Sequence, residues 1–195
     1  MSGGSPDGAI RAFLALEIPA AIKEDLARQV AALKPRLEPA RWVRSEGLHL
    51  TLKFLGESEP DRLERLADLL RPLLKGGGPV EVRLAGSGFF PGPRRPRVAW
   101  VGGTAAGAAE AASAIDTAAR RLGWERERRP FALHLTLARL RSPWRGESVE
   151  RWLEWGRGYA AAPFVCREVV LFRSRLEPGG AVYTPLERLP LGDGR

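Results

Sequence analysis

The chain has 195 residues, of which 44% are hydrophobic, so it can bury a core as one compact domain or as two small lobes. This composition excludes a disordered or fibrous protein. The formal net charge of +8 favours a polyanionic partner such as nucleic acid, because clustered Arg and Lys displace counterions from phosphates. A GC-rich coding sequence, which favours Arg, Ala, Gly and Pro, explains the charge equally well.

Cysteine content and apolar stretches indicate the compartment. Cys166 is the single cysteine, which excludes an internal disulfide and a cysteine-based zinc site. It lies in the apolar run FVCREVVLF and is predicted to be a buried small side chain rather than a nucleophile. The opening MSGGSPDG lacks the features of a signal peptide, and no stretch offers about 18 uninterrupted apolar residues. We therefore expect a cytoplasmic protein that does not enter a membrane.

Hydrophobic patterning predicts strands and helices in the first half of the chain. The apolar segment AIRAFLALEIP ends at a proline and indicates a buried strand followed by a helix. Leucines recur at helical spacing after Glu59, until GGGP ends that helix. The predicted strands are 9–19, 41–43, 48–56, 80–90 and 97–103, and the predicted helices are 20–34 and 59–74.

The second half repeats the theme of strand, helix and strand. The predicted helices are 105–122 and 147–155, and the predicted strands are 131–140, 164–172 and 181–189. This order lacks the regular alternation of a doubly wound parallel sheet. We therefore predict an α+β fold with mostly antiparallel sheets, formed by residues 1–195 as a single domain.

An internal repeat is the most informative feature of the sequence. Leu48-His49-Leu50-Thr51-Leu52 recurs letter for letter as residues 133–137, and the chain has no histidine outside the two copies. In a strand, His and Thr two residues apart point to one face, while the leucines point to the other. Each copy therefore presents an imidazole and a hydroxyl side by side. A core histidine is the ordinary reading of one copy, but the duplication favours a shared functional site.

Two histidines suit a reaction that removes one proton and supplies another near neutral pH. In-line hydrolysis of a cyclic phosphodiester is such a reaction, because water must be deprotonated and the departing ribose oxygen protonated. The hydroxyls of Thr51 and Thr136 could stabilise the phosphate oxygens. Arg139 would point to the opposite face by strict alternation, but a bulge could bring it over the pocket as a phosphate clamp. The two motif blocks contain no carboxylate or thiolate, so we expect no metal ion.

These residues resemble the 2H phosphoesterases, and within them the bacterial and archaeal RNA 2′,3′-cyclic phosphodiesterases, also called the 2′-5′ RNA ligase branch. The resemblance extends over RAFLALEIP, RWVRSEGLHLTLKFLGE, FFPGPRRPRVAWVG, FALHLTLAR and the closing strands. It implies a bilobal fold with helices outside and a pseudo-two-fold central cleft, to which each lobe contributes one HxT motif. It also implies conversion of a terminal cyclic phosphate to a 2′-phosphate without metal or cofactor.

The resemblance further assigns roles to residues of this chain. It implies that His49 is the proton donor, that His134 is the proton acceptor, and that Thr51, Thr136 and Arg139 bind the phosphate. One departure is that Leu133 stands where the family usually has a proline before the second motif. Four aromatic residues are candidates to stack on a terminal base: Trp42, Phe54, Phe89 and Phe90.

Three alternatives remain open from the sequence. By microscopic reversibility the same site could join a cyclic phosphate end to a 5′-hydroxyl, as a 2′-5′ RNA ligase. A non-catalytic RNA-binding module would use the basic surface alone. Beside Arg139, the loop residues Arg94, Arg95 and Arg97 are the first candidates to contact RNA phosphates. A phosphodiesterase for a small cyclic nucleotide would share the motifs. We expect a monomer that acts on RNA 3′ ends bearing a cyclic phosphate, for which tRNA fragments are one source.

Overall fold

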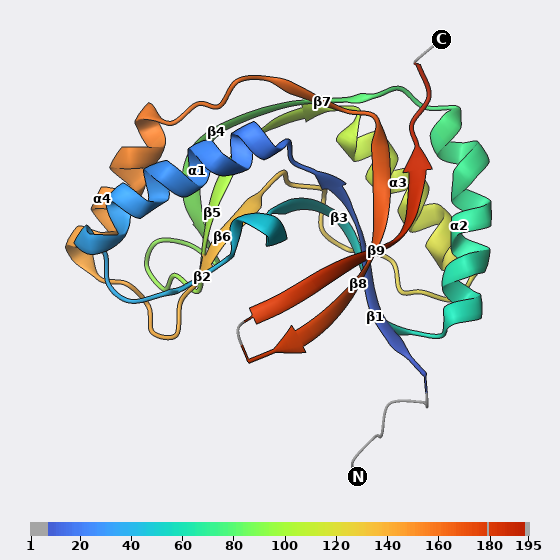
Figure 1. Ribbon diagram of the computed structural model, residues 1–195, viewed down its shortest axis with the longest axis horizontal. Helices are drawn as coiled ribbons and strands as arrows, with labels where there is room; N and C mark the ends of the chain where they lie inside the picture. Colours follow the sequence, from blue (N-terminus) through green and yellow to red (C-terminus); the bar gives the residue numbers. More distant parts are fainter. Residues whose placement is uncertain (1–7, 179, 194–195) are drawn as a thin grey trace.

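The computed structural model describes residues 8–178 and 180–193, so all but the last residue of the opening segment MSGGSPDG lie outside it. Nine strands and four α-helices are found in this part of the chain (Figure 1). The strands are β1 (Ile10–Glu17), β2 (Arg41–Trp42), β3 (His49–Ser58), β4 (Val80–Phe90), β5 (Val98–Ala106), β6 (Leu135–Arg139), β7 (Phe164–Cys166), β8 (Glu168–Glu177) and β9 (Gly180–Pro190). The helices are α1 (Ala20–Leu33), α2 (Pro60–Lys75), α3 (Ala108–Arg121) and α4 (Gly146–Gly158).

The strands form two antiparallel sheets. The first sheet has the order β3-β1-β8-β9, and the second has the order β2-β6-β5-β4-β7. The predicted α+β class with antiparallel sheets is therefore confirmed. One HLTL copy lies in each sheet, because β3 begins at His49 and β6 begins directly after His134.

The two sheets are related by an exchange of strands. The chain runs β1-α1-β3-α2-β4 and then β5-α3-β6-α4-β8, with β2, β7 and β9 added around this repeat. In the first sheet, β1 pairs with β3 of its own half and with β8 from the second half; in the second sheet, β5 pairs with β6 of its own half and with β4 from the first half. Each half of the chain thus completes the sheet of the other half, which produces the pseudo-two-fold arrangement.

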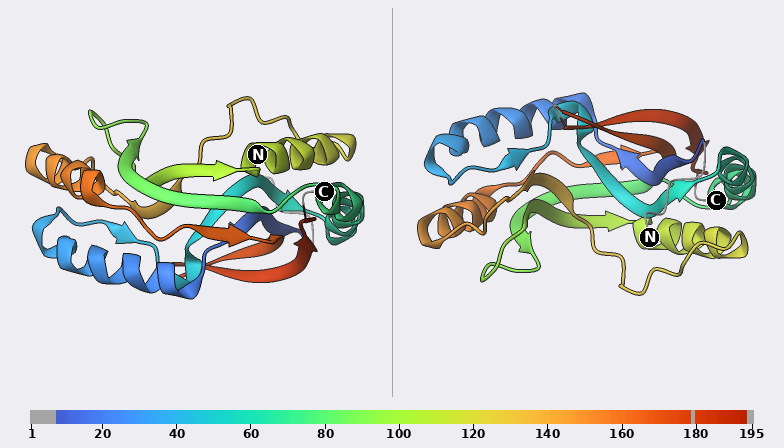
Figure 2. Two further views of the ribbon diagram at one scale, coloured as in Figure 1. Left: turned by 90° about the horizontal axis from the view of Figure 1, so that it is seen from above. Right: turned by 90° about the horizontal axis from the view of Figure 1, so that it is seen from below.

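Helices lie at the two ends of the molecule and strands lie between them. α1 and α4 are at one end, α2 and α3 are at the other, and the views from above and below agree (Figures 1 and 2). Leucines of both HLTL copies lie in the common core, since Leu50 and Leu135 are fully buried. α4 approaches β4 closely because Gly156 lies where a Cβ would overlap the Ser87 side chain. Within the described residues, no helix combines the length and apolarity needed to span a membrane.

The structure corrects three predicted boundaries. The run FVCREVVLF is not one strand, because β7 pairs with β4 in the second sheet and β8 pairs with β1 in the first. The predicted strand 131–140 is shorter, and β6 covers only its second half. The predicted helix 105–122 begins at Ala108, because β5 continues through Ala106 in its pairing with β4.

Cys166 is buried, as predicted. Its thiol donates a 3.4 Å hydrogen bond to the carbonyl of Glu17, and burial raises its pKa to about 11. A thiol that stays protonated at neutral pH is a poor nucleophile.

Candidate active site

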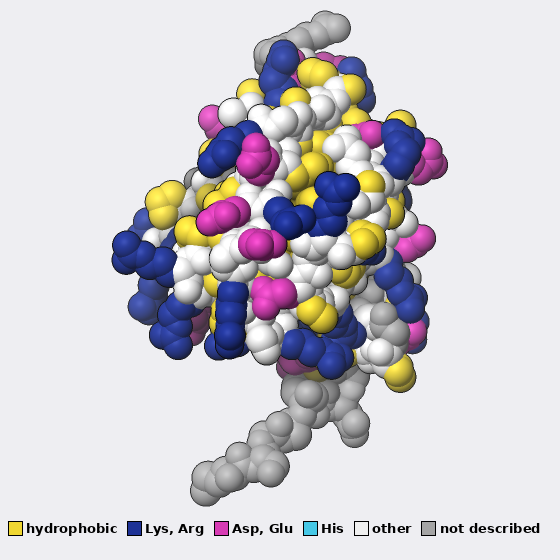
Figure 3. Space-filling view, turned by 90° about the vertical axis from the view of Figure 1, so that its left-hand side faces the viewer, with side chains coloured by type: hydrophobic (Ala, Val, Ile, Leu, Met, Phe, Trp, Pro, Cys, Tyr) yellow, Lys and Arg dark blue, Asp and Glu magenta, His cyan; other side chains and the backbone are white. Residues whose placement is uncertain are grey.

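A cleft of about 480 Å³ lies between the two sheets and is lined by the histidine and the threonine of both HLTL copies. His49 and Thr51 line it from β3, and His134, Thr136 and Arg139 line it from β6 and the residue before it. All five site residues proposed from the sequence therefore meet in one place. Figure 3 shows that neither histidine reaches the face of the molecule beside α1 and α4, where many Lys and Arg side chains are exposed.

Both imidazoles are oriented by the same kind of backbone hydrogen bond. Nδ1 of His49 lies 2.8 Å from the carbonyl oxygen of Gly47, and Nδ1 of His134 lies 2.9 Å from that of Ala132. A carbonyl oxygen only accepts, so Nδ1 carries the proton and donates it. Nε2 of each ring is then the atom that can take up or release a proton.

Aromatic side chains hold each imidazole in place. The ring of Tyr183 meets His49 edge-on, with centroids 4.9 Å apart and an interplanar angle of 86°. Phe90 meets His134 in the same way, at 4.9 Å and 89°. Phe13 also contacts His49, with centroids 4.6 Å apart, and it packs against Tyr183, with centroids 5.1 Å apart. These contacts restrict the rotation of the imidazoles before any substrate binds.

Burial and nearby positive charges determine the protonation state of His49. Burial lowers the pKa of His49 to about 4, and the positive charges of Lys23, His134 and Arg139 add to this effect, against the hydrogen bond to Gly47. His49 is therefore neutral at pH 7 in the free protein. Because the described residues that line the cleft include no carboxylate, the local field favours an anionic ligand.

A β-bulge brings Arg139 to the cleft. Consecutive residues of β5, Ala99 and Trp100, pair with Ala138 and Thr136, so Leu137 is an extra residue in β6. The extra residue reverses the alternation, and Arg139 shares a face with Thr136. The sequence allowed this orientation through strand twist or a bulge, and a bulge is present.

The first motif has an equivalent bulge. Leu14 and Ala15 of β1 pair with Lys53 and Thr51, which leaves Leu52 as the extra residue. Phe54 therefore points into the cleft at the position that Arg139 occupies in the second motif, and its side chain is 65% exposed.

A buried ion pair fixes the first bulge. Lys53 is only 8% exposed, and its Nζ lies 2.7 Å from Oδ1 of Asp116 and 3.0 Å from the carbonyl oxygen of Glu125. The backbone N–H of Glu127 also donates to Asp116, at 2.9 Å. Burial raises the pKa of Asp116, but the hydrogen bonds from Lys53 and Glu127 outweigh it and lower the pKa overall. This pair ties β3 to α3 and to the segment that leads to His134.

Of the four aromatic residues proposed to stack on a base, two line the cleft. Phe54 and Phe90 are exposed there, whereas Phe89 is 4% exposed and belongs to the core, so its assignment as a stacking surface is wrong. Trp42 also points away from the cleft and packs against Trp144 and Trp152. Arg94, Arg95 and Arg97 lie in the exposed loop between β4 and β5 and do not line the cleft.

Sequence reasoning missed the wall formed by β1 and the β8–β9 hairpin. The residues that this wall adds to the cleft include Arg11, Phe13, Ser174, Leu176, Ala181 and Tyr183. The predicted strands include Arg11, Phe13, Ala181 and Tyr183, but Ser174 and Leu176 lie beyond the predicted strand 164–172, because β8 continues to Glu177. No local signal shows that β9 would lie beside the first motif, from which it is distant in the chain.

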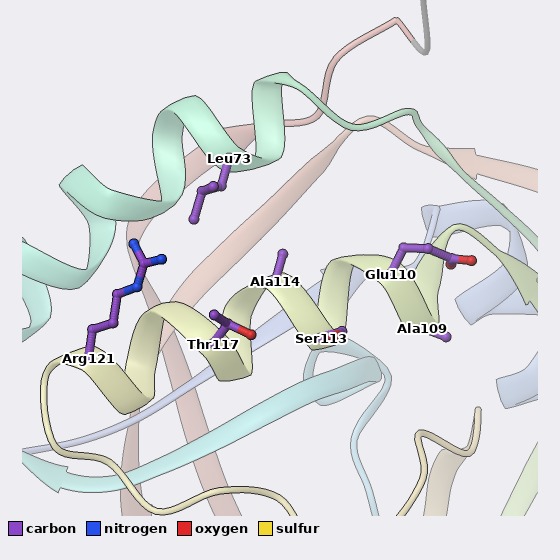
Figure 4. A pocket seen from close by; sticks show the side chains of 7 residues that line it. All are labelled: Leu73, Ala109, Glu110, Ser113, Ala114, Thr117 and Arg121. Atoms are coloured by element: carbon purple, nitrogen blue, oxygen red, sulfur yellow. The ribbon is translucent and has the colours of Figure 1, made fainter.

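A second hollow lies between α2 and α3 and has a different lining (Figure 4). It is lined mainly by small side chains of α3, with Leu73 of α2 opposite and Arg121 at one end. It contains neither histidine. Among the described residues, no three His, Cys, Asp or Glu side chains are grouped so as to hold a metal ion.

Comparison with known proteins identifies the family. The sequence matches the LigT-like phosphoesterase family over residues 16–100 and 102–183. It is 30% identical over 179 residues to the RNA 2′,3′-cyclic phosphodiesterase of Methanothermobacter thermautotrophicus, covering 91% of this chain and 97% of that protein. The enzyme of the same name from Thermus thermophilus is 33% identical over 193 residues, covering 93% and 90% of the two chains.

Solved structures agree with the sequence matches. A crystal structure of a Thermus thermophilus protein superposes with a TM-score of 0.78 at 28% identity, covering 95% of this chain and 99% of that one. Escherichia coli LigT complexed with 3′-AMP superposes with a TM-score of 0.70 at 28% identity, covering 94% and 98%. The chain therefore belongs to the LigT-like phosphoesterase family of 2H phosphoesterases.

Proposed function

We propose that this protein hydrolyses the 2′,3′-cyclic phosphate at the 3′ end of RNA to a 2′-phosphate. The observation that carries the proposal is the pair of histidines in one cleft, each with Nδ1 bonded to a carbonyl and Nε2 left for proton transfer. The names of the relatives from Methanothermobacter and Thermus support the same substrate.

The reaction divides between the two imidazoles. Nε2 of His134 takes a proton from water while the water oxygen attacks phosphorus. The bond from phosphorus to the ribose 3′ oxygen breaks, and Nε2 of His49 donates a proton to that oxygen. Each proton transfer contributes roughly 10²–10⁴ in rate. Because His49 is neutral in the free protein, it must be protonated when the anionic phosphate binds beside it.

Three further side chains bind the phosphate in this proposal. The hydroxyls of Thr51 and Thr136 donate to its non-bridging oxygens, one from each wall of the cleft. Arg139 neutralises its charge from the end of β6. Phe54 and Phe90, both exposed in the cleft, offer apolar surfaces on which a terminal base can stack.

In this proposal the protein works as one domain and needs no metal ion. Residues 1–195 act as a single domain of two lobes, each supplying one HxT motif, and the protein works as a monomer in the cytoplasm. Catalysis requires no metal ion, because imidazoles perform both proton transfers and the described cleft lining offers no carboxylate or thiolate ligand.

The test is incubation with an RNA that ends in a 2′,3′-cyclic phosphate, followed by chromatography of the new 3′ end. We expect one isomer, the 2′-phosphate, and the same rate in EDTA. A 3′-phosphate would contradict the assignment of the leaving oxygen, and loss of activity in EDTA would contradict metal-free catalysis. An added RNA with a 5′-hydroxyl detects ligation in the same assay.

Variants test the role of each histidine. His49→Ala and His134→Ala should each lower the rate by at least about 10², and the double variant should be only slightly worse, because the two act as a unit. Thr104→Ala, at an exposed position of β5 outside the cleft, is a matched control for Thr51→Ala and Thr136→Ala. Full activity in the double histidine variant would refute the proposal.

A further inference from the structure

Two arginines face each other at the mouth of the cleft. Arg41 of β2 is the direct cross-strand partner of Arg139 of β6. Directly opposite residues have Cβ atoms about 5 Å apart on the same face of a sheet, and like charges in this position repel. The pairing of Arg41 with Arg139 is therefore unfavourable unless another group neutralises one of the two charges.

Neighbouring residues show that Arg41 lies on the cleft side of the sheet. Trp42, the next residue, packs into the core against Trp144 and Trp152. Val43 lines the cleft. Because side chains alternate along an extended chain, Arg41 shares the face of Val43 and not that of Trp42. Arg41 itself is exposed and stands just outside the residues that line the cleft.

No carboxylate in the described part of the chain forms an ion pair with either of these charges. The other arginine of the cleft, Arg11, has a glutamate, Glu57, as its cross-strand partner, whereas Arg41 has another arginine. Arg41 also extends toward the β8–β9 hairpin, since a Cβ built on Gly180 would lie 3.9 Å from its Nη2.

We propose that Arg41 binds the phosphodiester that links the terminal nucleotide of the RNA to the one before it. The inference rests on the proposed function, in which Arg139 binds the terminal phosphate. A second phosphate, one nucleotide away, neutralises the charge of Arg41 and relieves its repulsion from Arg139. The RNA then leaves the cleft between β2 and Gly180 of β9, and the preferred substrate is an oligonucleotide rather than a cyclic mononucleotide.

The experiment is a cycle that combines one change in the protein with one in the ligand. Binding is measured for two dinucleotides that end in a 2′-phosphate, one with a normal phosphodiester and one with a neutral methylphosphonate linkage. We expect Arg41→Gln to weaken binding of the charged dinucleotide about tenfold, the size of losing one charge-assisted hydrogen bond. Binding of the methylphosphonate dinucleotide should change much less.

Two comparisons make the cycle decisive. Arg83→Gln, at an exposed position of β4 outside the cleft, is the matched control and should affect both ligands equally. An equal loss for both ligands with Arg41→Gln would mean that Arg41 acts only through the general field, and would overturn the inference. So would a linkage-dependent loss with Arg11→Gln and none with Arg41→Gln.

Kinetics separate this inference from the proposed function. On cyclic-phosphate substrates, the wild-type protein should prefer the dinucleotide to the mononucleotide, and Arg41→Gln should reduce this preference about tenfold. If neither substrate is hydrolysed, the proposed function fails, while the binding cycle still decides the role of Arg41. If both are hydrolysed and the preference is unchanged in Arg41→Gln, the inference alone fails.

Discussion

His49 combines a buried position with the proposed task of donating a proton. Its pKa of about 4 in the free protein keeps it neutral, and only a bound anion can raise that pKa toward the ordinary value of about 6.5. We expect an NMR titration of His49 to show protonation near pH 4 without ligand and at distinctly higher pH with a nucleoside 2′-phosphate. Uridine is the neutral control. If the 2′-phosphate leaves the titration unchanged, His49 is the base and His134 the acid.

The same shift couples the stability of the protein to pH. The unfolded chain binds a proton at His49 near pH 6.5, but the folded protein does so only near pH 4. The part of the free energy of unfolding that depends on His49 is therefore fully present above pH 6.5. It is lost as the pH falls from 6.5 toward 4, and the total loss is at most about 3 kcal/mol. Urea unfolding at pH 7 and pH 4 should show a smaller loss for His49→Gln than for the wild type. Equal losses would contradict the shifted pKa.

At the scale of secondary structure, the ion pair between Lys53 and Asp116 secures β3. Asp116→Ala leaves the ammonium of Lys53 buried without its partner and should lower the free energy of unfolding by about 3–5 kcal/mol. Replacing Lys53 by Met in the same protein should recover most of this loss, because it removes the unpaired charge. Urea denaturation measures both effects.

Asp25→Ala provides the matched control for this ion pair. It breaks the pair between Asp25 and Arg28, whose arginine side chain is 75% exposed, so the expected loss is less than about 1 kcal/mol. If Asp116→Ala costs no more than this control, burial of the pair between Lys53 and Asp116 contributes nothing to stability.

The elements that sequence patterning predicts well are those with a strong local period. The leucines of α2 and the alternation in β3 determined both elements within a residue or two. Patterning failed at Arg167, where the chain passes from one sheet to the other, because the run FVCREVVLF contains no Gly or Pro that would signal a turn between the two strands. The positions of His49 and His134 in one cleft followed from duplication, whereas Tyr183 carries no motif and was found only in three dimensions.

At the scale of the whole molecule, the net charge of +8 should make RNA binding sensitive to salt. If the loop between β4 and β5 contacts RNA, replacing Arg94, Arg95 and Arg97 by Gln should weaken binding and flatten the dependence of log K on log salt concentration by up to about 3. Fluorescence anisotropy with a labelled RNA at several salt concentrations measures both.

A triple variant with the same loss of charge is the control for this loop. Arg65, Arg83 and Arg157 are exposed on α2, β4 and α4, and none of them lines the cleft. If both triple variants lower the salt dependence equally, only total charge matters, and the loop is not a contact site.

The exchange of β4 and β8 between the two sheets also has a consequence for inheritance. Residues 8–90 contain β1 and β3 without the β8 that completes their sheet, and residues 98–193 contain β5 and β6 without β4. A gene fragment that encodes one HxT motif therefore encodes no complete sheet. Recombination that transfers one motif alone transfers an incomplete sheet, so the proposed acid and base of the reaction are best inherited together.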